Sequence, residues 1–126
     1  MKIALSHRRV VAICFGLSTL FVGANWAILL FVANLPSVSP LDNLSFFLSS
    51  QNEHQIFFIA LAVSFLVCIA LLAAYLSPAS HLKAGALVLL LIAIVHTVGA
   101  FWMFVWPIGL FSLIGASYGF LVWRQA

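Results

Sequence analysis

Residues 56–76 read IFFIALAVSFLVCIALLAAYL, and this stretch contains no charged side chain. An α-helix rises about 1.5 Å per residue, so these residues would form a helix about 31 Å long. That length matches the hydrocarbon core of a lipid bilayer, which is roughly 30 Å thick. The stretch therefore predicts a helix that spans a membrane.

Three other apolar runs flank this stretch. Together the four runs predict helices at about residues 10–33, 54–76, 82–105 and 107–123. The last run is the shortest, and Trp123 and Arg124 would anchor its end at the membrane interface. Since 66% of the residues are hydrophobic and only 6% are charged, a soluble domain would lack polar surface. We therefore expect an all-α fold, an integral membrane four-helix bundle that forms a single domain over residues 1–126.

The longest connection, residues 34–55, carries both acidic residues of the chain and no Lys or Arg. Within it, residues 39–42 read SPLD, which combines an N-cap serine, a proline suited to a first helical turn and an acid. Apolar residues then recur at helical spacing up to Leu48. This pattern predicts a short interfacial helix in the first outer loop.

Serines precede two of the predicted spans. Ser50 and Glu53 have the spacing of a capping box, which predicts the start of the second span. Ser77 or Ser80 would cap the third span in the same way.

The basic residues all fall on flanks that a four-span topology places on one side of the membrane. They are Lys2, Arg8, Arg9, Lys83 and Arg124. Under the positive-inside rule this distribution predicts that both termini are cytoplasmic. We expect the chain to reside in a bacterial inner (plasma) membrane.

Several classes of function are not expected. The formal charge of +3 is scattered over membrane flanks and forms no basic stripe, so nucleic acid is not an expected partner. Cys14 and Cys68 are too few for a disulfide framework. The sequence shows no arrangement of serine, cysteine and histidine typical of a catalytic nucleophile and its base. It also has no phosphate-binding glycine loop and no HExxH motif. We expect no enzyme, no catalytic or metal-binding residues and no cofactor, haem included.

The apolar runs proper are residues 10–33, 56–76, 84–105 and 108–123, and they contain no Asp, Glu, Lys or Arg and one histidine, His96. An ionisable side chain at membrane depth is costly and usually faces a partner or a cavity. Counting from the cytoplasmic helix ends places His96 at roughly 20 Å and Asn25 at roughly 24 Å, which predicts a hydrogen bond between them. Thr97 and Ser64 would complete a polar cluster. Such a cluster either fixes helix packing or forms a proton-sensitive or ligand-holding site.

Small residues predict close helix contacts. Gly115 and Gly119 form a GxxxG motif in the last predicted helix, and Ser112 and Ala116 continue the small face. The helix that packs there belongs either to the same chain or to another subunit.

The absence of intramembrane carboxylates argues against proton-coupled or sodium-coupled transport. Short loops and small-residue seams favour contact with other membrane proteins. We therefore expect a non-catalytic accessory subunit of a membrane complex, with the lipid bilayer and a membrane-protein partner or a homo-oligomer around it. Two alternatives remain open: an immunity-type membrane binding protein, and a small oligomeric channel or carrier that uses His96.

Overall fold

The computed structural model describes residues 2–32, 39–49, 53–103 and 105–126, and all regular structure in these ranges is helical. The elements are α1 (Lys2–Ala27), the π-helical turn η1 (Ile28–Val32), α2 (Pro40–Phe47), α3 (Gln55–Leu76), the 3₁₀ turn η2 (Pro78–His81), α4 (Lys83–Trp102) and α5 (Trp106–Gln125). Within the described residues, four helical stretches are long and apolar enough to span a membrane. They are His7–Phe31, Gln55–Leu76, Lys83–Trp102 and Trp106–Gln125.

Two helix starts differ from the sequence-based expectation. Helix α1 begins at Lys2 and not near residue 10, because the polar and charged residues before the apolar run are helical as well. Ser77 caps the η2 turn, where its hydroxyl accepts a hydrogen bond from the Ala79 N–H at 3.3 Å. Helix α4 begins after Leu82, so the expected serine cap of this helix is wrong.

The short α2 helix lies within the connection between the first and second spans, and α3 begins where this connection ends. Helix α2 begins at Pro40 after Ser39, whose carbonyl accepts the Asn43 N–H at 3.1 Å. Ser50, the first residue of the expected capping box, lies outside the described residues. Helix α3 begins at Gln55.

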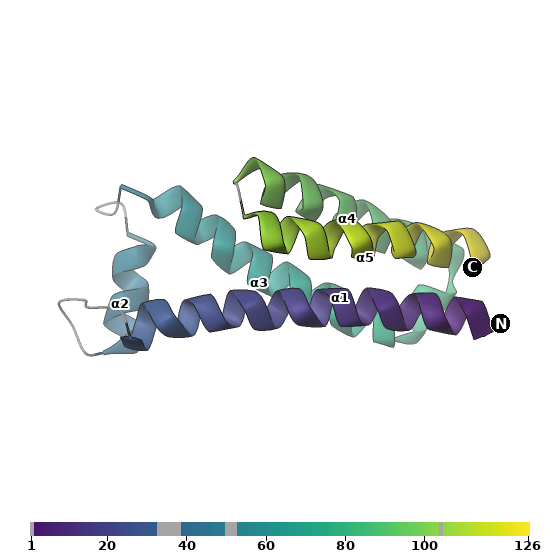
Figure 1. Ribbon diagram of the computed structural model, residues 1–126, viewed down its shortest axis with the longest axis horizontal. Helices are drawn as coiled ribbons and strands as arrows, with labels where there is room; N and C mark the ends of the chain where they lie inside the picture. Colours follow the sequence, from purple (N-terminus) through teal and green to yellow (C-terminus); the bar gives the residue numbers. More distant parts are fainter. Residues whose placement is uncertain (1, 33–38, 50–52, 104) are drawn as a thin grey trace.

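The four long helices run roughly along one axis, with both termini and the α3–α4 connection at one end (Figure 1). Helix α5 packs along α1 and α4, and α1 packs along α3, whereas α3 and α4 touch over a short stretch. Figure 1 shows α3 leaning away from α1 towards the end where α2 lies. Of the four spans, α3 is the least buried.

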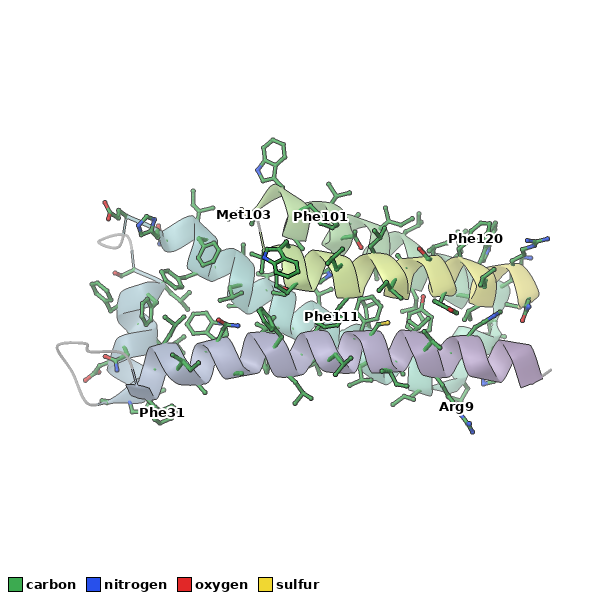
Figure 2. All side chains as sticks on the ribbon, in the orientation of Figure 1. Arg9, Phe31, Phe101, Met103, Phe111 and Phe120 are labelled. Carbon is green, nitrogen blue, oxygen red and sulfur yellow. The ribbon has the colours of Figure 1, made fainter. Side chains whose placement is uncertain are left out.

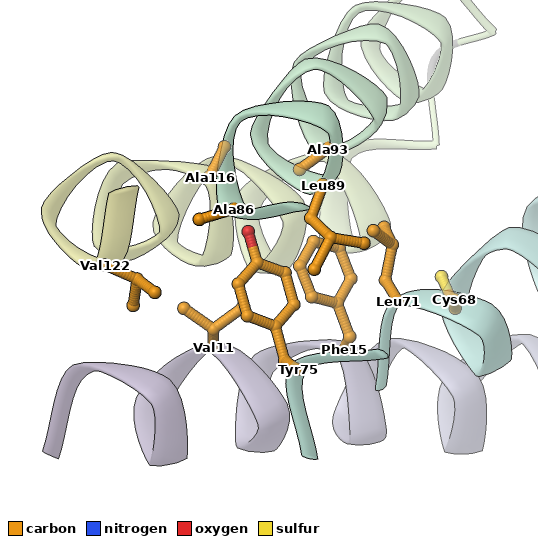
Figure 3. Close-up of a cluster of buried hydrophobic side chains, with 10 residues drawn as sticks. All are labelled: Val11, Phe15, Cys68, Leu71, Tyr75, Ala86, Leu89, Ala93, Ala116 and Val122. Carbon is orange, nitrogen blue, oxygen red and sulfur yellow. The ribbon is translucent and has the colours of Figure 1, made fainter. Parts of the chain in front are cut away.

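The core near the termini draws on all four long helices. Phe15 of α1 stacks against Tyr75 of α3, with ring centroids 6.5 Å apart, and small residues of α4 and α5 cover both rings (Figure 3). The buried cluster consists of Val11, Phe15, Cys68, Leu71, Tyr75, Ala86, Leu89, Ala93, Ala116 and Val122.

A second, aromatic core holds α2 against the opposite ends of α1 and α3. The Phe47 ring lies 6.1 Å from Trp26 and 4.5 Å from Phe58, measured between centroids. The Asn43 side chain donates to the Leu30 carbonyl at 3.0 Å, which ties α2 to η1. This packing makes α2 a folded part of the molecule.

Large apolar side chains project from the outer faces of the long helices (Figure 2). Leu20, Leu66 and Val95 are 70%, 65% and 72% exposed. A soluble protein rarely leaves such continuous apolar surface in water. The arrangement indicates a membrane-embedded protein whose apolar faces contact lipid.

Candidate functional site

His96 lies on α4 where three helices meet, and each of its ring nitrogens has a hydroxyl neighbour. Nε2 is 2.7 Å from the Ser64 hydroxyl of α3, and Nδ1 is 2.9 Å from the Ser112 hydroxyl of α5. The Phe15 ring of α1 packs edge-on against the imidazole at 6.3 Å between centroids. One side chain therefore links α3, α4 and α5 and rests on α1.

The hydrogen bonds form a directed chain. The Thr97 hydroxyl donates to the Ala93 carbonyl at 2.8 Å, so it accepts from the Ser112 hydroxyl at 2.6 Å. Ser112, having used its one proton, accepts from His96 Nδ1–H. Nε2 is then the acceptor of the Ser64 hydroxyl. We infer a neutral imidazole protonated at Nδ1, with both nitrogens satisfied.

The sequence-predicted cluster is therefore only partly assembled. The structure brings His96, Thr97 and Ser64 together, but the Asn25 side chain donates to the Phe21 carbonyl of its own helix at 2.8 Å. Asn25 follows Phe15, which lies level with His96, by ten residues, or about 15 Å along α1. The depth count failed because α1 begins at Lys2.

Ser112 was not among the predicted site residues, although it makes two of the closest contacts. A depth count would have found it. Ser112 and His96 each lie six residues from the end of their helix at the α4–α5 turn, which puts both about 9 Å deep. Cys68 also approaches His96 Nε2, at 3.5 Å from sulfur to nitrogen. It lies one turn after Ser64 on α3.

An apolar groove opens beside this cluster, between α3 and α4. It encloses about 570 Å³, Val67 and Leu91 line one end of it, and Ser64 and His96 lie further along its wall. Met103, labelled in Figure 2, lines the other end near the α4–α5 turn. Its walls include Phe57, Ala60, Val67, Leu91, Val95, Gly99 and Ile108.

No family model, curated protein or solved structure matches this chain. The function must therefore be argued from its own geometry.

The two glycines of the GxxxG motif pack within the chain. A Cβ atom on Gly115 would lie 2.9 Å from the Phe15 ring of α1. A Cβ atom on Gly119 would lie 2.7 Å from the Tyr75 hydroxyl of α3. Both positions are buried, so this face of α5 contacts helices of the same chain.

In the described residues no group of three or more His, Cys, Asp or Glu side chains could hold a metal ion. The hydroxyl and imidazole protons are already committed to partners in the chain of hydrogen bonds. The arrangement is suited to holding helices in register and to presenting a shaped apolar surface.

Proposed function

We propose that this chain is a non-catalytic accessory subunit of a membrane complex and that it acts by contact with another membrane protein. In this proposal a transmembrane helix of the partner packs into the groove between α3 and α4. The observation that carries it is the groove itself, since α3 and α4 touch over a short stretch and leave apolar walls uncovered.

The dimensions of the groove support a helix as the occupant. Its lining extends from Phe57 to Val67 on α3, which is about 15 Å along the helix axis. That is half the thickness of the hydrocarbon core. The volume divided by this length gives a cross-section of roughly 40 Å², less than the section of a whole helix of about 10 Å diameter. The groove therefore suits one ridge of side chains from a helix that lies along it.

The residue types of the walls support the same occupant. Ala60 on α3 and Gly99 on α4 let a helix backbone approach closely, as small residues do in membrane helix interfaces. A Cβ atom placed on Gly99 would meet no atom within 4 Å. The Ser64 hydroxyl oxygen can still accept a hydrogen bond, which a lipid chain does not use and a polar side chain of a partner does.

A channel or carrier that uses His96 is less well supported. The apolar runs contain no carboxylate, and the hydrogen-bond chain from Ser64 to Ala93 leaves His96 with a partner at each nitrogen. Proton and ion pathways in membranes usually contain ionisable side chains that face a water-filled cavity. The groove beside His96 is almost wholly apolar.

The orientation is part of the proposal. We infer a four-helix bundle with both termini cytoplasmic in a bacterial inner membrane, because the Lys and Arg residues gather at the end of the termini. Cysteines introduced by Ser45→Cys and Ala126→Cys test it with a membrane-impermeant maleimide. Labelling of position 45 from outside and of position 126 only after lysis is expected. The reverse pattern would invert the topology.

The contact itself is tested with two matched alanine substitutions on α3. Ala60→Leu fills the groove, whereas Ala70→Leu adds the same side chain on an exposed face away from it. We expect a tagged wild-type chain and the Ala70→Leu variant to retain one stoichiometric membrane protein in mild detergent, identified by mass spectrometry. The Ala60→Leu variant should lose it.

Two results would refute the proposed function. One is a wild-type chain that purifies as a monomer with no stoichiometric partner. The other is a partner that the Ala60→Leu and wild-type chains retain equally. Because Ala60→Leu adds its side chain to open space in the groove, its thermal unfolding should match that of Ala70→Leu, and this comparison separates lost contact from lost fold.

A further inference from the structure

The described basic side chains gather at one end of the molecule, and the acidic side chains lie at the other. Arg8, Arg9, Lys83 and Arg124 belong to the end that carries the termini and the α3–α4 connection (Figure 1). Asp42 is on α2, and Glu53 precedes α3. The 22 residues of α3 separate the two ends by about 33 Å, several Debye lengths of about 8 Å. No Asp or Glu of this chain therefore neutralises the basic end.

Arg8 and His81 form the best-defined contact at this end. Arg8 Nη1 lies 2.6 Å from His81 Nδ1, and it links α1 to the η2 turn. A guanidinium has only N–H donors, so His81 Nδ1 must be the acceptor and His81 Nε2 must carry the proton. Among the described residues, the remaining guanidinium N–H groups and the Nε2–H have no acceptor. A ligand for this set must supply acceptor oxygens.

Lys83 is a further cation at the same end, and its contact with a tryptophan indicates how deep this end lies in the membrane. Its ammonium lies 5.2 Å from the centroid of the Trp123 ring at the end of α5. Tryptophan is typical of the headgroup level of a bilayer. Since Lys83 follows His81 by two residues, the cations of α1, α4 and α5 lie at the level of lipid phosphates.

We propose that the basic end binds the headgroup of an anionic diacyl phospholipid in the surrounding leaflet. Arg8 and His81 donate hydrogen bonds to the phosphate oxygens, and Lys83 adds a second positive charge near them. Arginine suits this role because its planar fork pairs with phosphate oxygens two at a time. The inference is independent of the partner proposed for the groove at the other end of α3.

Arg9 provides a matched control within the same helix. It carries the same charge one residue further on, but its side chain points away from the other helices (Figure 2). A site built by Arg8 and His81 should respond to Arg8 much more than to Arg9. If diffuse positive charge alone bound the lipid, the loss of Arg8 and the loss of Arg9 should weaken binding equally.

The experiment is native mass spectrometry of the full chain in a non-ionic detergent with equimolar phosphatidylglycerol and phosphatidylcholine of the same acyl chains. We expect a preference for phosphatidylglycerol that Arg8→Gln lowers by about fivefold, the effect of one cation at an anionic surface. Arg9→Gln should change the preference less. Arg8→Lys should give an intermediate value, because lysine keeps the charge and lacks the fork.

Absence of a phosphatidylglycerol preference in the wild-type chain would overturn the proposal, as would equal losses in Arg8→Gln and Arg9→Gln. Circular dichroism and the elution volume in detergent show whether Arg8→Gln folds. If it does not, His81→Ala tests the same site, because it removes the Nε2 donor, and a lower preference is again expected. Displacement of the lipid by excess glycerol phosphate would mean a site for free phosphate and would also overturn the proposal.

Discussion

Helix α4 has two neighbours, and it meets them in different ways. Against α5 it packs along its length, because α5 offers a small-residue face of Gly109, Ser112, Ala116 and Gly119. Against α3 it touches over a short stretch, and the groove opens on both sides of the Ser64–His96 hydrogen bond.

The difference shows that side-chain size decides which interfaces close. Lipid and protein interiors are similarly apolar, so membrane helices associate mainly through close packing and hydrogen bonds. The small face of α5 offers α4 both close packing and a hydrogen bond, between Ser112 and His96. On α3 the wall carries the larger side chains Phe57, Leu61 and Val67, and α3 touches α4 over a short stretch. The open interface is thus available to a further helix, whereas the closed one is complete.

Substitution of one glycine in each region should give the largest contrast. Gly119→Leu adds a side chain where even a Cβ atom would lie 2.7 Å from the Tyr75 hydroxyl. We expect a loss of about 3 kcal/mol in unfolding free energy, at the upper end of the usual cost of overpacking. Gly99→Leu adds the same atoms to the groove and should leave stability unchanged or slightly raised, because leucine favours the helix.

Unfolding in SDS, followed by circular dichroism, measures both glycine variants. The interpretation of the groove as open space would be wrong if Gly99→Leu lost as much stability as Gly119→Leu. A tolerated Gly119→Leu would show instead that α5 can move away from α3.

Much of this fold follows from the sequence, because a bilayer imposes simple requirements. Charge-free runs long enough to cross it predict the four long helices, and the SPLD motif predicts α2. The helix bounds were less predictable. Lys2 to Arg9 continue α1 outside the apolar run, and the Ser77-Pro78 pair starts a 3₁₀ turn before α4 begins.

The polar cluster shows where sequence reasoning reaches its limit. The absence of other intramembrane histidines singled out His96, and a small residue one turn before Ala116 made Ser112 visible as a helix-packing position. Partners across helices depend on the relative height and rotation of the helices, which composition does not fix. A shift in the start of α1 was enough to replace Asn25 with Phe15 as the neighbour of His96.

His96→Ala should give the second-largest effect, because it removes the link between the closed and the open interface. Two interhelical hydrogen bonds are lost, each worth about 0.6 kcal/mol and at most about 1.7 in membrane proteins. We expect a loss of about 1–2 kcal/mol in SDS unfolding. Asn25→Ala, which removes a bond within α1 only, is the matched control and should lose less. Equal losses of stability in His96→Ala and Asn25→Ala would mean that His96 has no role in joining the helices.

Ser64→Ala should give the smallest effect and the most local one. It removes the hydrogen bond to His96 that holds α3 to α4 beside the groove, at a cost of about 0.6 kcal/mol. Because Cys68 lies one turn further along α3 and is buried, separation of the helices should expose its thiol. A membrane-soluble maleimide should then modify Cys68 about threefold faster relative to Cys14 on α1, as peptide mass spectrometry can measure. Ser117→Ala, whose hydroxyl bonds only to Leu113 of its own helix, should leave the ratio unchanged. An unchanged ratio in Ser64→Ala would mean that the packing of α3 on α1 alone sets the width of the groove.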